Sequence, residues 1–178
     1  MTPSDSQPAP AVRRATPADL PAVGRLGALL VRTHHGFDPG RFIEATPRTE
    51  RSYASFIGSQ LGEPDVVVLI AELNGEVVGY TYAALEGYDY MALRGPAGVL
   101  HDIVVEPASR GQGVGRMLLD ATLAELEDLG APRVVLSTAE RNEPAQRLFG
   151  RAGFRRTMIE MTREPGESPP LDGQDEET

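Results

Sequence analysis

Apolar residues recur at helical spacing in four segments of the chain. In the first, five leucine and valine side chains repeat every three or four residues and share one helical face: Leu20, Val23, Leu26, Leu29 and Leu30. The preceding Thr16-Pro17-Ala18-Asp19 supplies an N-cap threonine and a proline at the first helical position, so we expect this helix to run from Thr16 to about His34. The same spacing predicts further helices over 49–61, 114–129 and 142–152.

Shorter segments rich in β-branched and aromatic residues separate these helices and predict strands. The clearest pair is 66–73 and 76–85, which Asn74-Gly75 joins as the two-residue signal of a β-hairpin. Further strands are expected over 11–15, 99–105, 133–137 and 154–163.

This order of elements predicts the fold class, α/β (α+β) with a mixed sheet. The second half of the chain alternates strands and helices, which favours parallel pairing around a crossover helix, whereas the hairpin is antiparallel. The length of 178 residues suits one domain, and we assign it to residues 11–163. Residues 1–10 and the acidic residues 164–178 lack a periodic apolar pattern, so both are expected to be disordered tails.

Absent residue types exclude several kinds of chemistry. The chain contains no lysine and no cysteine. It therefore lacks a Walker lysine, a Schiff-base lysine, a thiolate nucleophile and a zinc–thiolate site, and no metal is expected. Residues 1–10 hold Asp5 and three prolines, unlike a secretory signal, and the longest apolar stretches are strand-sized, so we expect a cytoplasmic protein without a membrane partner.

The charge of the chain is unevenly distributed. The formal net charge is -9, which argues against a nucleic-acid partner. Six acids lie in residues 164–178 without an arginine, whereas residues 11–163 carry 19 acids and 17 arginines. The predicted domain is therefore nearly neutral, and five of its arginines fall in two glycine-containing segments that could face an anion: Arg110, Arg116, Arg141, Arg147 and Arg151.

The first of these segments, 104–116, joins the end of a predicted strand to the start of a helix through a glycine-rich turn. Backbone amides at a helix start lack intrahelical acceptors and point toward the positive end of the helix dipole, which favours a bound phosphate. An ordinary strand-to-helix turn is the alternative interpretation. A dinucleotide fingerprint that starts at Gly111 would need glycine where the chain has Arg116, and a Walker loop would need lysine, so both are excluded.

Two motifs resemble those of the GNAT superfamily of N-acetyltransferases. Arg110, Gly113 and Gly115 match its Gln/Arg-x-x-Gly-x-Gly/Ala pyrophosphate loop. Residues 142–154 are similar to its Asn-x-x-Ala-x-x-Leu-aromatic-x-x-x-Gly-Phe motif. A capped helix with Gly153 as its C-cap also accounts for the second motif, but not for the joint spacing of the two.

The resemblance, which covers about residues 11–163, implies a central, mostly antiparallel sheet with a splayed parallel strand pair and about four flanking helices. It also implies acetyl-CoA as cosubstrate, with pantetheine between strand 103–105 and its neighbour 134–137. Backbone amides of the loop would hold the pyrophosphate, Asn142 would bond the pantetheine region, three residues of the last helix would line the thiol end, and a backbone amide near Val105 would polarise the thioester carbonyl. The implied cofactor-binding residues are Ile103, Val104, Val105, Arg110, Gly111, Gln112, Gly113, Val114, Gly115, Arg116, Asn142, Ala145, Leu148 and Phe149.

Two catalytic positions depart from the pattern of many family members. Phe149 occupies the position of a tyrosine acid and cannot donate a proton, and the strand before Asn142 offers no carboxylate. Asp102 interrupts an apolar strand and is our first candidate base, unless it caps a backbone or pairs with an arginine. His101 is the alternative base, and strand alternation predicts that the two side chains face opposite sides of the sheet.

The function predicted by the resemblance is transfer of acetyl from acetyl-CoA to a primary amine of a small molecule or peptide by direct attack. The alternatives are an acetyl-CoA-binding sensor without turnover and acyl transfer to oxygen. Acceptor contacts are expected from His34, His35, Phe37 and Arg41 and from Tyr88, Tyr90 and Arg94, and the adjacent histidines are interpreted as surface residues. Because no clear strand follows Arg163, a second copy of the chain is a candidate partner that could complete the groove.

Overall fold

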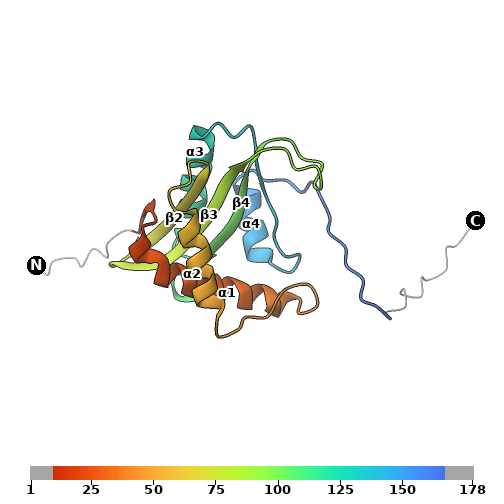
Figure 1. The fold of residues 1–178 in the computed structure, drawn as a ribbon, viewed down its shortest axis with the longest axis horizontal. Coiled ribbons are helices and arrows are strands. Elements are labelled where there is room, and N and C mark those ends of the chain that lie inside the picture. The colour runs from red at the N-terminus through yellow and green to blue at the C-terminus, as the bar shows by residue number, and fades with distance from the viewer. Residues whose placement is uncertain (1–9, 167–178) are drawn as a thin grey trace, which may run out of the picture.

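The computed structural model describes residues 10–166. Its centre is a five-stranded sheet with helices on both faces (Figure 1). The strands are β1 (Ala11–Arg14), β2 (Val66–Leu73), β3 (Glu76–Glu86), β4 (Ala97–Val105) and β5 (Val134–Leu136). The helices are α1 (Leu20–Phe37), α2 (Thr49–Gln60), α3 (Val114–Asp128) and α4 (Glu143–Arg151), with the short 3-10 helices η1 (Pro17–Asp19) and η2 (Pro107–Ser109).

The strands lie in the sheet in the order of the sequence, β1-β2-β3-β4-β5. Neighbours pair antiparallel except for β4 and β5, which are parallel. The β2–β3 hairpin turns at Asn74 and Gly75, whose φ angles are 54° and 80°, as a two-residue turn between twisted strands requires. The predicted mixed sheet and its hairpin are confirmed.

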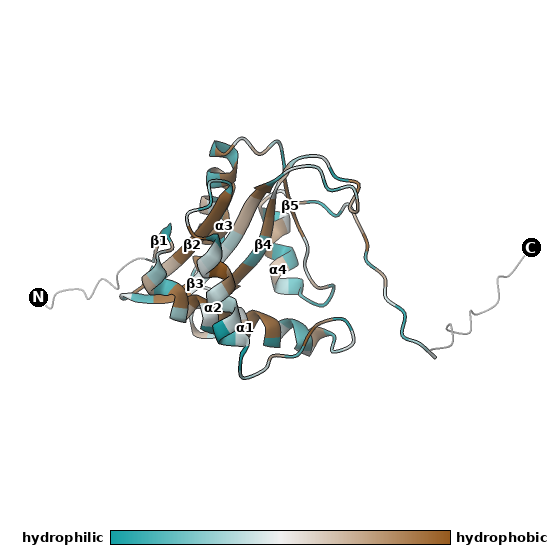
Figure 2. Ribbon diagram, viewed as in Figure 1, coloured by the Kyte–Doolittle hydropathy of each residue, from teal (hydrophilic) through white to brown (hydrophobic). Residues whose placement is uncertain are grey.

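Two apolar cores lie on opposite faces of the sheet because side chains alternate along each strand. Val67 and Leu69 of β2 pack toward the α3 and α4 side, where Leu118 is fully buried. Val68 and Ile70 pack toward the α1 and α2 side. A strand covered on both faces needs a continuous apolar run, and Figure 2 shows β2 as mostly hydrophobic between the two helical layers.

The prediction of a last strand over 154–163 is wrong. After α4 ends, the chain leaves in an extended conformation without strand pairing and runs away from the sheet (Figure 1). A strand needs a partner for its backbone groups, and among the described residues the sheet ends at β5. An exposed ion pair between Arg41 and Glu160 is the contact that ties the segment back to the loop after α1.

The remaining boundary predictions differ from the structure by a few residues. α1 extends to Phe37 instead of His34, and its first turn is the separate 3-10 helix η1. The tails predicted for 1–10 and 164–178 lie almost entirely outside the described residues. Within residues 10–166, no helix is long and apolar enough to cross a membrane.

A buried carboxylate joins β1 to the start of α1. The Asp19 side chain is 6% exposed and accepts hydrogen bonds from Arg13 Nη1 and Nη2 at 2.8 and 2.9 Å. It also accepts from the backbone amide and the hydroxyl of Thr16 at 2.8 and 2.9 Å. These bonds, with the Arg13 guanidinium first among them, hold the pKa of the Asp19 carboxyl below its ordinary value.

We expect Asp19→Asn to lower the free energy of unfolding at pH 7 by about 2 kcal/mol, because it removes the charged partner of Arg13 from a buried position. Since the folded-state pKa of Asp19 is depressed, its stabilisation is complete above the unfolded-state pKa of about 4 and is lost as the pH falls. Urea unfolding at pH 7 and pH 3 should therefore show a smaller difference from wild type at pH 3.

Glu143→Gln is the control, since this carboxylate is 77% exposed and pairs with Arg147 on the surface of α4. An equal loss of stability in both variants at pH 7 would contradict the role given to Asp19.

Candidate functional site

The parallel strands β4 and β5 pair over three residues and then diverge. Gly98, Val99 and Leu100 lie opposite Val134, Val135 and Leu136. β4 continues to Val105, but β5 ends at Leu136, so the β4 edge from His101 onward has no strand beside it. This is the splayed pair that the sequence motifs imply.

The free edge of β4 presents backbone groups at its carboxyl end. The Glu106 amide donates to the Val78 carbonyl at 2.8 Å, toward β3. Because neighbouring residues of a strand direct their backbone groups to opposite edges, the amide and carbonyl of Val105 point away from β3. Arg110 Nε donates to this carbonyl at 3.0 Å and fastens the glycine-rich loop to the strand end. The Val105 amide stays available at the free edge.

The loop from Gly111 to Arg116 gathers backbone amides at the start of α3. Gly111 and Gly113 have φ angles of 75° and 82°, which favour glycine, and beyond each glycine and its two chain neighbours no described atom lies within 4 Å of the position of an added Cβ. The first amide of this region that donates to a backbone carbonyl is that of Met117, which bonds Gly113 at 3.0 Å. Within the described residues, the amides from Gly111 to Arg116 therefore form an open, positively polarised cradle suited to an anion.

The polar side chains of the loop are held by neighbouring protein groups. Arg116 bonds Asp120 at 2.8 Å and the Arg151 carbonyl at 3.2 Å, which connects the start of α3 to the end of α4. Gln112 Nε2 donates to the Ala108 carbonyl at 3.2 Å. These contacts shape the loop, and the groups open to a ligand there are the backbone amides.

The second motif forms α4. Asn142 is its N-cap and accepts a bond of 3.4 Å from the Ala145 amide, so the capped-helix interpretation holds. Leu148 reaches the glycine loop and lies 3.6 Å from the position of an added Cβ at Gly115. Phe149 is buried and packs on Phe154 with ring centroids 5.9 Å apart.

A β-bulge in β4 brings the two candidate bases to the same face of the sheet. Tyr82 pairs with Asp102, but the next residue, Ala83, pairs with Leu100, so His101 is the extra residue. His101 stacks on Tyr82, and Asp102 accepts a bond from Tyr80 on the same side. The prediction of opposite faces is wrong because it assumed regular alternation.

Asp102 is surrounded by hydroxyl and imidazole groups from four elements. The fully buried Tyr80 of β3 donates to Asp102 Oδ2 at 2.8 Å, and Tyr53 of α2 also interacts with this carboxylate. Burial raises the pKa of Asp102, while the hydrogen bond from Tyr80, the charges of His101 and His34 and the Tyr53 hydroxyl oppose the shift. No arginine pairs with Asp102 among the described residues, and a raised pKa makes it a stronger base than an exposed aspartate.

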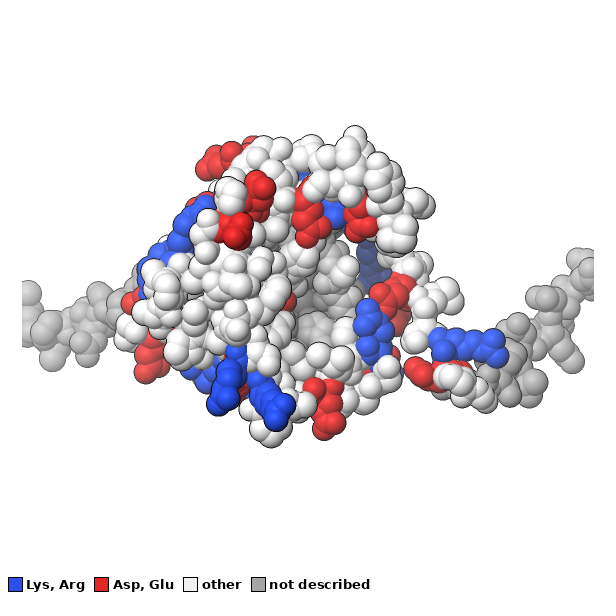
Figure 3. Space-filling view, viewed as in Figure 1, with Lys and Arg blue, Asp and Glu red and all other residues white. Residues whose placement is uncertain are grey.

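His101 belongs to a charged cluster beside Asp102. Its ring lies 5.0 Å from that of Tyr82, with 23° between their planes, and its Nε2 lies 2.8 Å from Glu86 Oε1. Arg94 bonds the other oxygen of Glu86 at 2.8 Å and lies 3.8 Å from Asp89. Figure 3 shows a hollow in this view of the molecule with acidic and basic side chains along its rim.

The acetyltransferase (GNAT) family model matches residues 31–154, which include β2 to β5, the glycine-rich loop and α4. The chain belongs to the GNAT acetyltransferase family. GNAT acetyltransferases use acetyl-CoA. The amide cradle and the free β4 edge of this GNAT domain have the chemistry of a site for a diphosphate followed by an amide-bearing chain.

Curated relatives include enzymes named for small-molecule substrates. Mycothiol acetyltransferase of Thermomonospora curvata is 31% identical over 156 residues, which are 80% of this chain and 49% of that protein. Aminoalkylphosphonate N-acetyltransferase of Salmonella typhimurium is 29% identical over 119 residues, 65% of this chain and 76% of that protein. The chain spans about half or less of the length of the mycothiol acetyltransferases. It covers 49% of the enzyme of Thermomonospora curvata and 31% of that of Thermobispora bispora.

Solved structures share the fold. Aminoglycoside N-acetyltransferase AAC(6')-Iy in complex with CoA has a TM-score of 0.67 at 19% identity, with 93% of this chain and 99% of that chain covered. A transcriptional regulator from Bacillus halodurans C-125 also has a TM-score of 0.67, at 20% identity, with 87% and 99% covered. At these identities the likeness shows the GNAT fold alone.

Sequence reasoning named Asp102 and His101 but missed the tyrosines around them. Tyr80 lies in the predicted hairpin strand 76–85 and Tyr53 in the predicted helix 49–61, and neither was assigned a role. His34, expected as an acceptor contact, is close enough for its charge to act on Asp102. In this GNAT domain, the cluster around Asp102 is drawn from α1, α2, β3 and β4, and no single sequence segment contains it.

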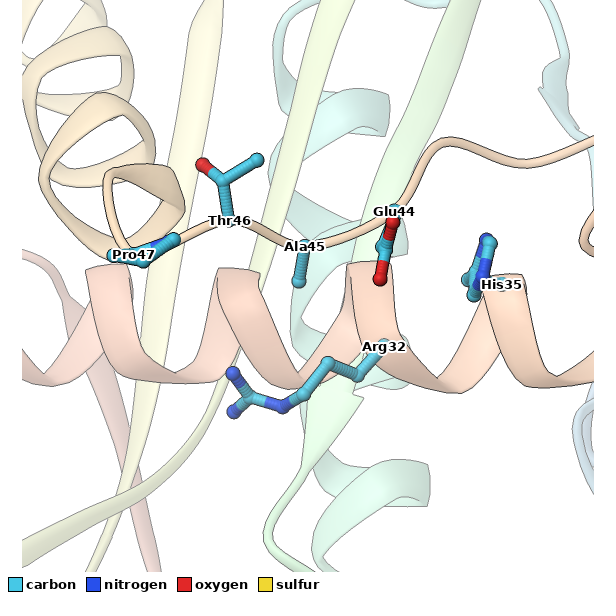
Figure 4. Close-up of a pocket in the computed structure, with 6 residues that line it drawn as sticks. All are labelled: Arg32, His35, Glu44, Ala45, Thr46 and Pro47. Atoms are coloured by element: carbon cyan, nitrogen blue, oxygen red, sulfur yellow. The ribbon is translucent and has the colours of Figure 1, made fainter.

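A second hollow of about 430 Å³ lies between α1 and the segment before α2 (Figure 4). Its lining residues are Arg32, His35, Glu44, Ala45, Thr46 and Pro47, none of which was predicted for the cofactor or for catalysis. His35 Nδ1 lies 2.9 Å from the Phe42 carbonyl, so this histidine braces the loop after α1. Among residues 10–166, no three histidine or acidic side chains are grouped to bind a metal.

Proposed function

We propose that this GNAT domain transfers the acetyl group of acetyl-CoA to a primary amine of a small molecule. The observation that carries the proposal is the continuity between the free edge of β4 and the open amide cradle at the start of α3. One face of this strand also holds Asp102, a partly buried carboxylate that pairs with no arginine among residues 10–166. An anion site, a backbone edge and a base therefore follow one another along one strand and the loop after it.

Different groups of the chain bind different parts of acetyl-CoA. Backbone amides from Gly111 to Arg116 hold the diphosphate, and the β4 edge at Ile103 to Val105 pairs with the pantetheine amides. Leu148 of α4 borders the loop from the other side, and Ala145 lies one turn earlier on the same helix; both are half-buried. The free amide of Val105 is the donor offered to the thioester carbonyl oxygen, where negative charge develops during attack.

The acceptor amine must lose a proton during the reaction. A lysine-like amine with a pKa of about 10.4 costs about 4 to 5 kcal/mol to deprotonate at pH 7, which a nearby base can offset. The amine nitrogen attacks the carbonyl carbon, its proton passes to Asp102, and the carbon–sulfur bond breaks. Since Phe149 cannot donate a proton, the released thiolate takes one from water, which is tolerable for a thiol pKa of about 8.5.

The names of the relatives favour a small-molecule acceptor. One acts on an aminoalkylphosphonate and others are mycothiol acetyltransferases. A peptide amine remains the second acceptor class. A binding module without turnover is the alternative function, and the burial of Phe149 against Phe154 favours it because no side-chain acid is supplied from that position.

The decisive experiment measures thiol release from acetyl-CoA with a panel of primary amines and alcohols. Because the chain has no cysteine, a thiol reagent reports only the released CoA. Turnover on an amine supports the proposal, turnover confined to alcohols would indicate acyl transfer to oxygen, and CoA binding without turnover on any acceptor would indicate a binding module.

On the acceptor found in this way, Asp102→Asn should reduce kcat by about 100-fold or more, in the range of general-base catalysis, with an unchanged dissociation constant for acetyl-CoA. His101→Asn keeps a hydrogen-bonding side chain at the bulge and should retain most of the activity. If the histidine variant loses the activity and the aspartate variant keeps it, the role of base belongs to His101.

Gly113→Ala should weaken CoA binding at least tenfold, because the left-handed backbone becomes costly and the added Cβ occupies the space that a diphosphate must approach. Gly130→Ala is a matched control, since Gly130 has a φ angle of 83°, against 82° for Gly113, and the same open surroundings at the far end of α3. Calorimetric titration with CoA should separate the two variants, while both lose about 1 kcal/mol of stability. Equal CoA affinity in the two variants would refute the cradle.

A second copy of the chain is the partner we propose. Ten large apolar side chains are exposed within residues 10–166, and seven of them lie in the β3–β4 loop and in the segment after α4: Tyr88, Tyr90, Met91, Leu93, Met158, Ile159 and Met161. In the part of the chain that the structure describes, β5 is an edge strand of the sheet and pairs only with β4. The chain thus carries both an unpaired extended segment and an unpaired edge, which two copies can exchange about a two-fold axis.

Sedimentation of the full chain should therefore give a dimer, and the double substitution Ile159→Asp and Met161→Asp should give a monomer. Ile43→Asp introduces the same charge at a side chain that is 77% exposed on another loop, and it should leave the dimer intact. A monomeric wild type at micromolar concentration, or a dimer that survives the double substitution, would contradict this interface.

A further inference from the structure

Tyr80 and Tyr53 reach Asp102 from two different layers of the fold. Tyr80 lies in β3 and is fully buried, and its hydroxyl donates to Asp102 Oδ2 at 2.8 Å. Tyr53 lies in α2 and interacts with both Asp102 and Tyr80. The three groups therefore form one partly buried polar cluster between the sheet and the α1–α2 layer.

The position of Tyr53 depends on a glycine of α1. A Cβ added at Gly27 would lie 2.1 Å from Tyr53 Cδ1 and 2.4 Å from its Cγ, closer than atoms can pack. α1 thus lacks a side chain where the Tyr53 ring lies against it. This fit holds the ring in place, so the packing of α1 against α2 positions the Tyr53 side chain.

We propose that the hydroxyls of Tyr80 and Tyr53 are positioning groups that hold the Asp102 carboxylate in its charged form beside the bulge. The inference rests on the proposed function of Asp102 as the base. Tyr80 hydrogen-bonds the carboxylate directly, the Tyr53 hydroxyl favours its charged form, and both act on the reaction through it.

The electrostatics explain why such groups are needed. Burial favours the neutral form of a carboxyl group, and a neutral Asp102 cannot accept a proton from an amine. The groups that face Asp102 and favour its charged form are Tyr80 of β3, His101 of β4, Tyr53 of α2 and His34 of α1. Removing one hydroxyl should therefore raise the pKa of Asp102 further and keep it protonated up to a higher pH.

A structural role predicts a different result. A buried hydroxyl that only satisfies a polar neighbour contributes to stability, and its loss lowers the melting temperature without moving the pH dependence of catalysis. A positioning role moves the acidic limb of the pH profile. The two roles can therefore be separated by measuring kcat/KM against pH.

In Tyr80→Phe, the acidic limb of kcat/KM should move to higher pH by about one unit, the effect of losing one hydrogen bond to a charged group. Activity at the foot of the limb should fall about tenfold and recover at alkaline pH. Tyr53→Phe should shift the limb in the same direction. Tyr53 is only half-buried, so Tyr53→Phe should fold even if Tyr80→Phe does not, and the pH profile can then be measured on this second variant.

Tyr82→Phe is the matched control. Tyr82 lies on the same strand and the same face as Tyr80, but its hydroxyl lies 3.4 Å from Gln60 Oε1 and makes no hydrogen bond to Asp102. Its acidic limb should coincide with that of wild type. All variants are compared on one acceptor, so the ionisation of the acceptor amine contributes equally to each profile.

Asp102→Asn separates the possible failures. The part of the acidic limb that Asp102→Asn loses belongs to Asp102, and the part that remains belongs to the acceptor amine; if the shape of the Asp102→Asn profile coincides with that of wild type, the assignment of Asp102 as base is wrong. If this variant loses the limb but the Tyr80 and Tyr53 profiles coincide with wild type, the base stands and the positioning role is refuted. An equal shift in Tyr82→Phe would also refute it, since the effect would then not depend on contact with Asp102.

Discussion

Two consecutive residues of β4, His101 and Asp102, face the same side of the sheet because Tyr82 pairs with Asp102 while Ala83 pairs with Leu100. The β-bulge lies where β5 ceases to pair with β4, so one short stretch of backbone both opens the sheet and redirects its side chains. Without the bulge, regular alternation would place His101 and Asp102 on opposite faces. The geometry of the whole candidate site depends on this irregular pairing.

The two faces of the sheet serve different parts of the site. On one side, α3 and α4 pack on the core around Leu118 and bring the glycine-rich loop and Leu148 together. On the other side, α1 and α2 cover Tyr80 and supply Tyr53 and His34 around Asp102. β4 lies between the two regions: the glycine-rich loop follows its carboxyl end, and Asp102 lies on its α1–α2 face.

Local sequence patterns predicted the hairpin, the central strand β2 and the glycine-rich loop. The Asn74-Gly75 turn needs positive φ angles and fixes the hairpin wherever it occurs, and the alternation along β2 identifies a strand covered on both faces. The spacing of Arg110, Gly113 and Gly115 marked a loop whose amides are open in the structure. The segment 154–163 misled the prediction because a strand-like composition does not supply a neighbouring strand, and the sheet among the described residues ends at β5.

The sequence by itself determined the GNAT family, the order of the elements, the amide cradle at the start of α3 and the two candidate bases, since all of these depend on residues close together in the chain. Only the tertiary structure decided which side chains meet Asp102. Tyr53, Tyr80 and His34 lie 22 or more positions away from it, and helix packing and strand pairing bring them together. The strength of a base depends on such distant neighbours, because burial and hydrogen bonding set its pKa.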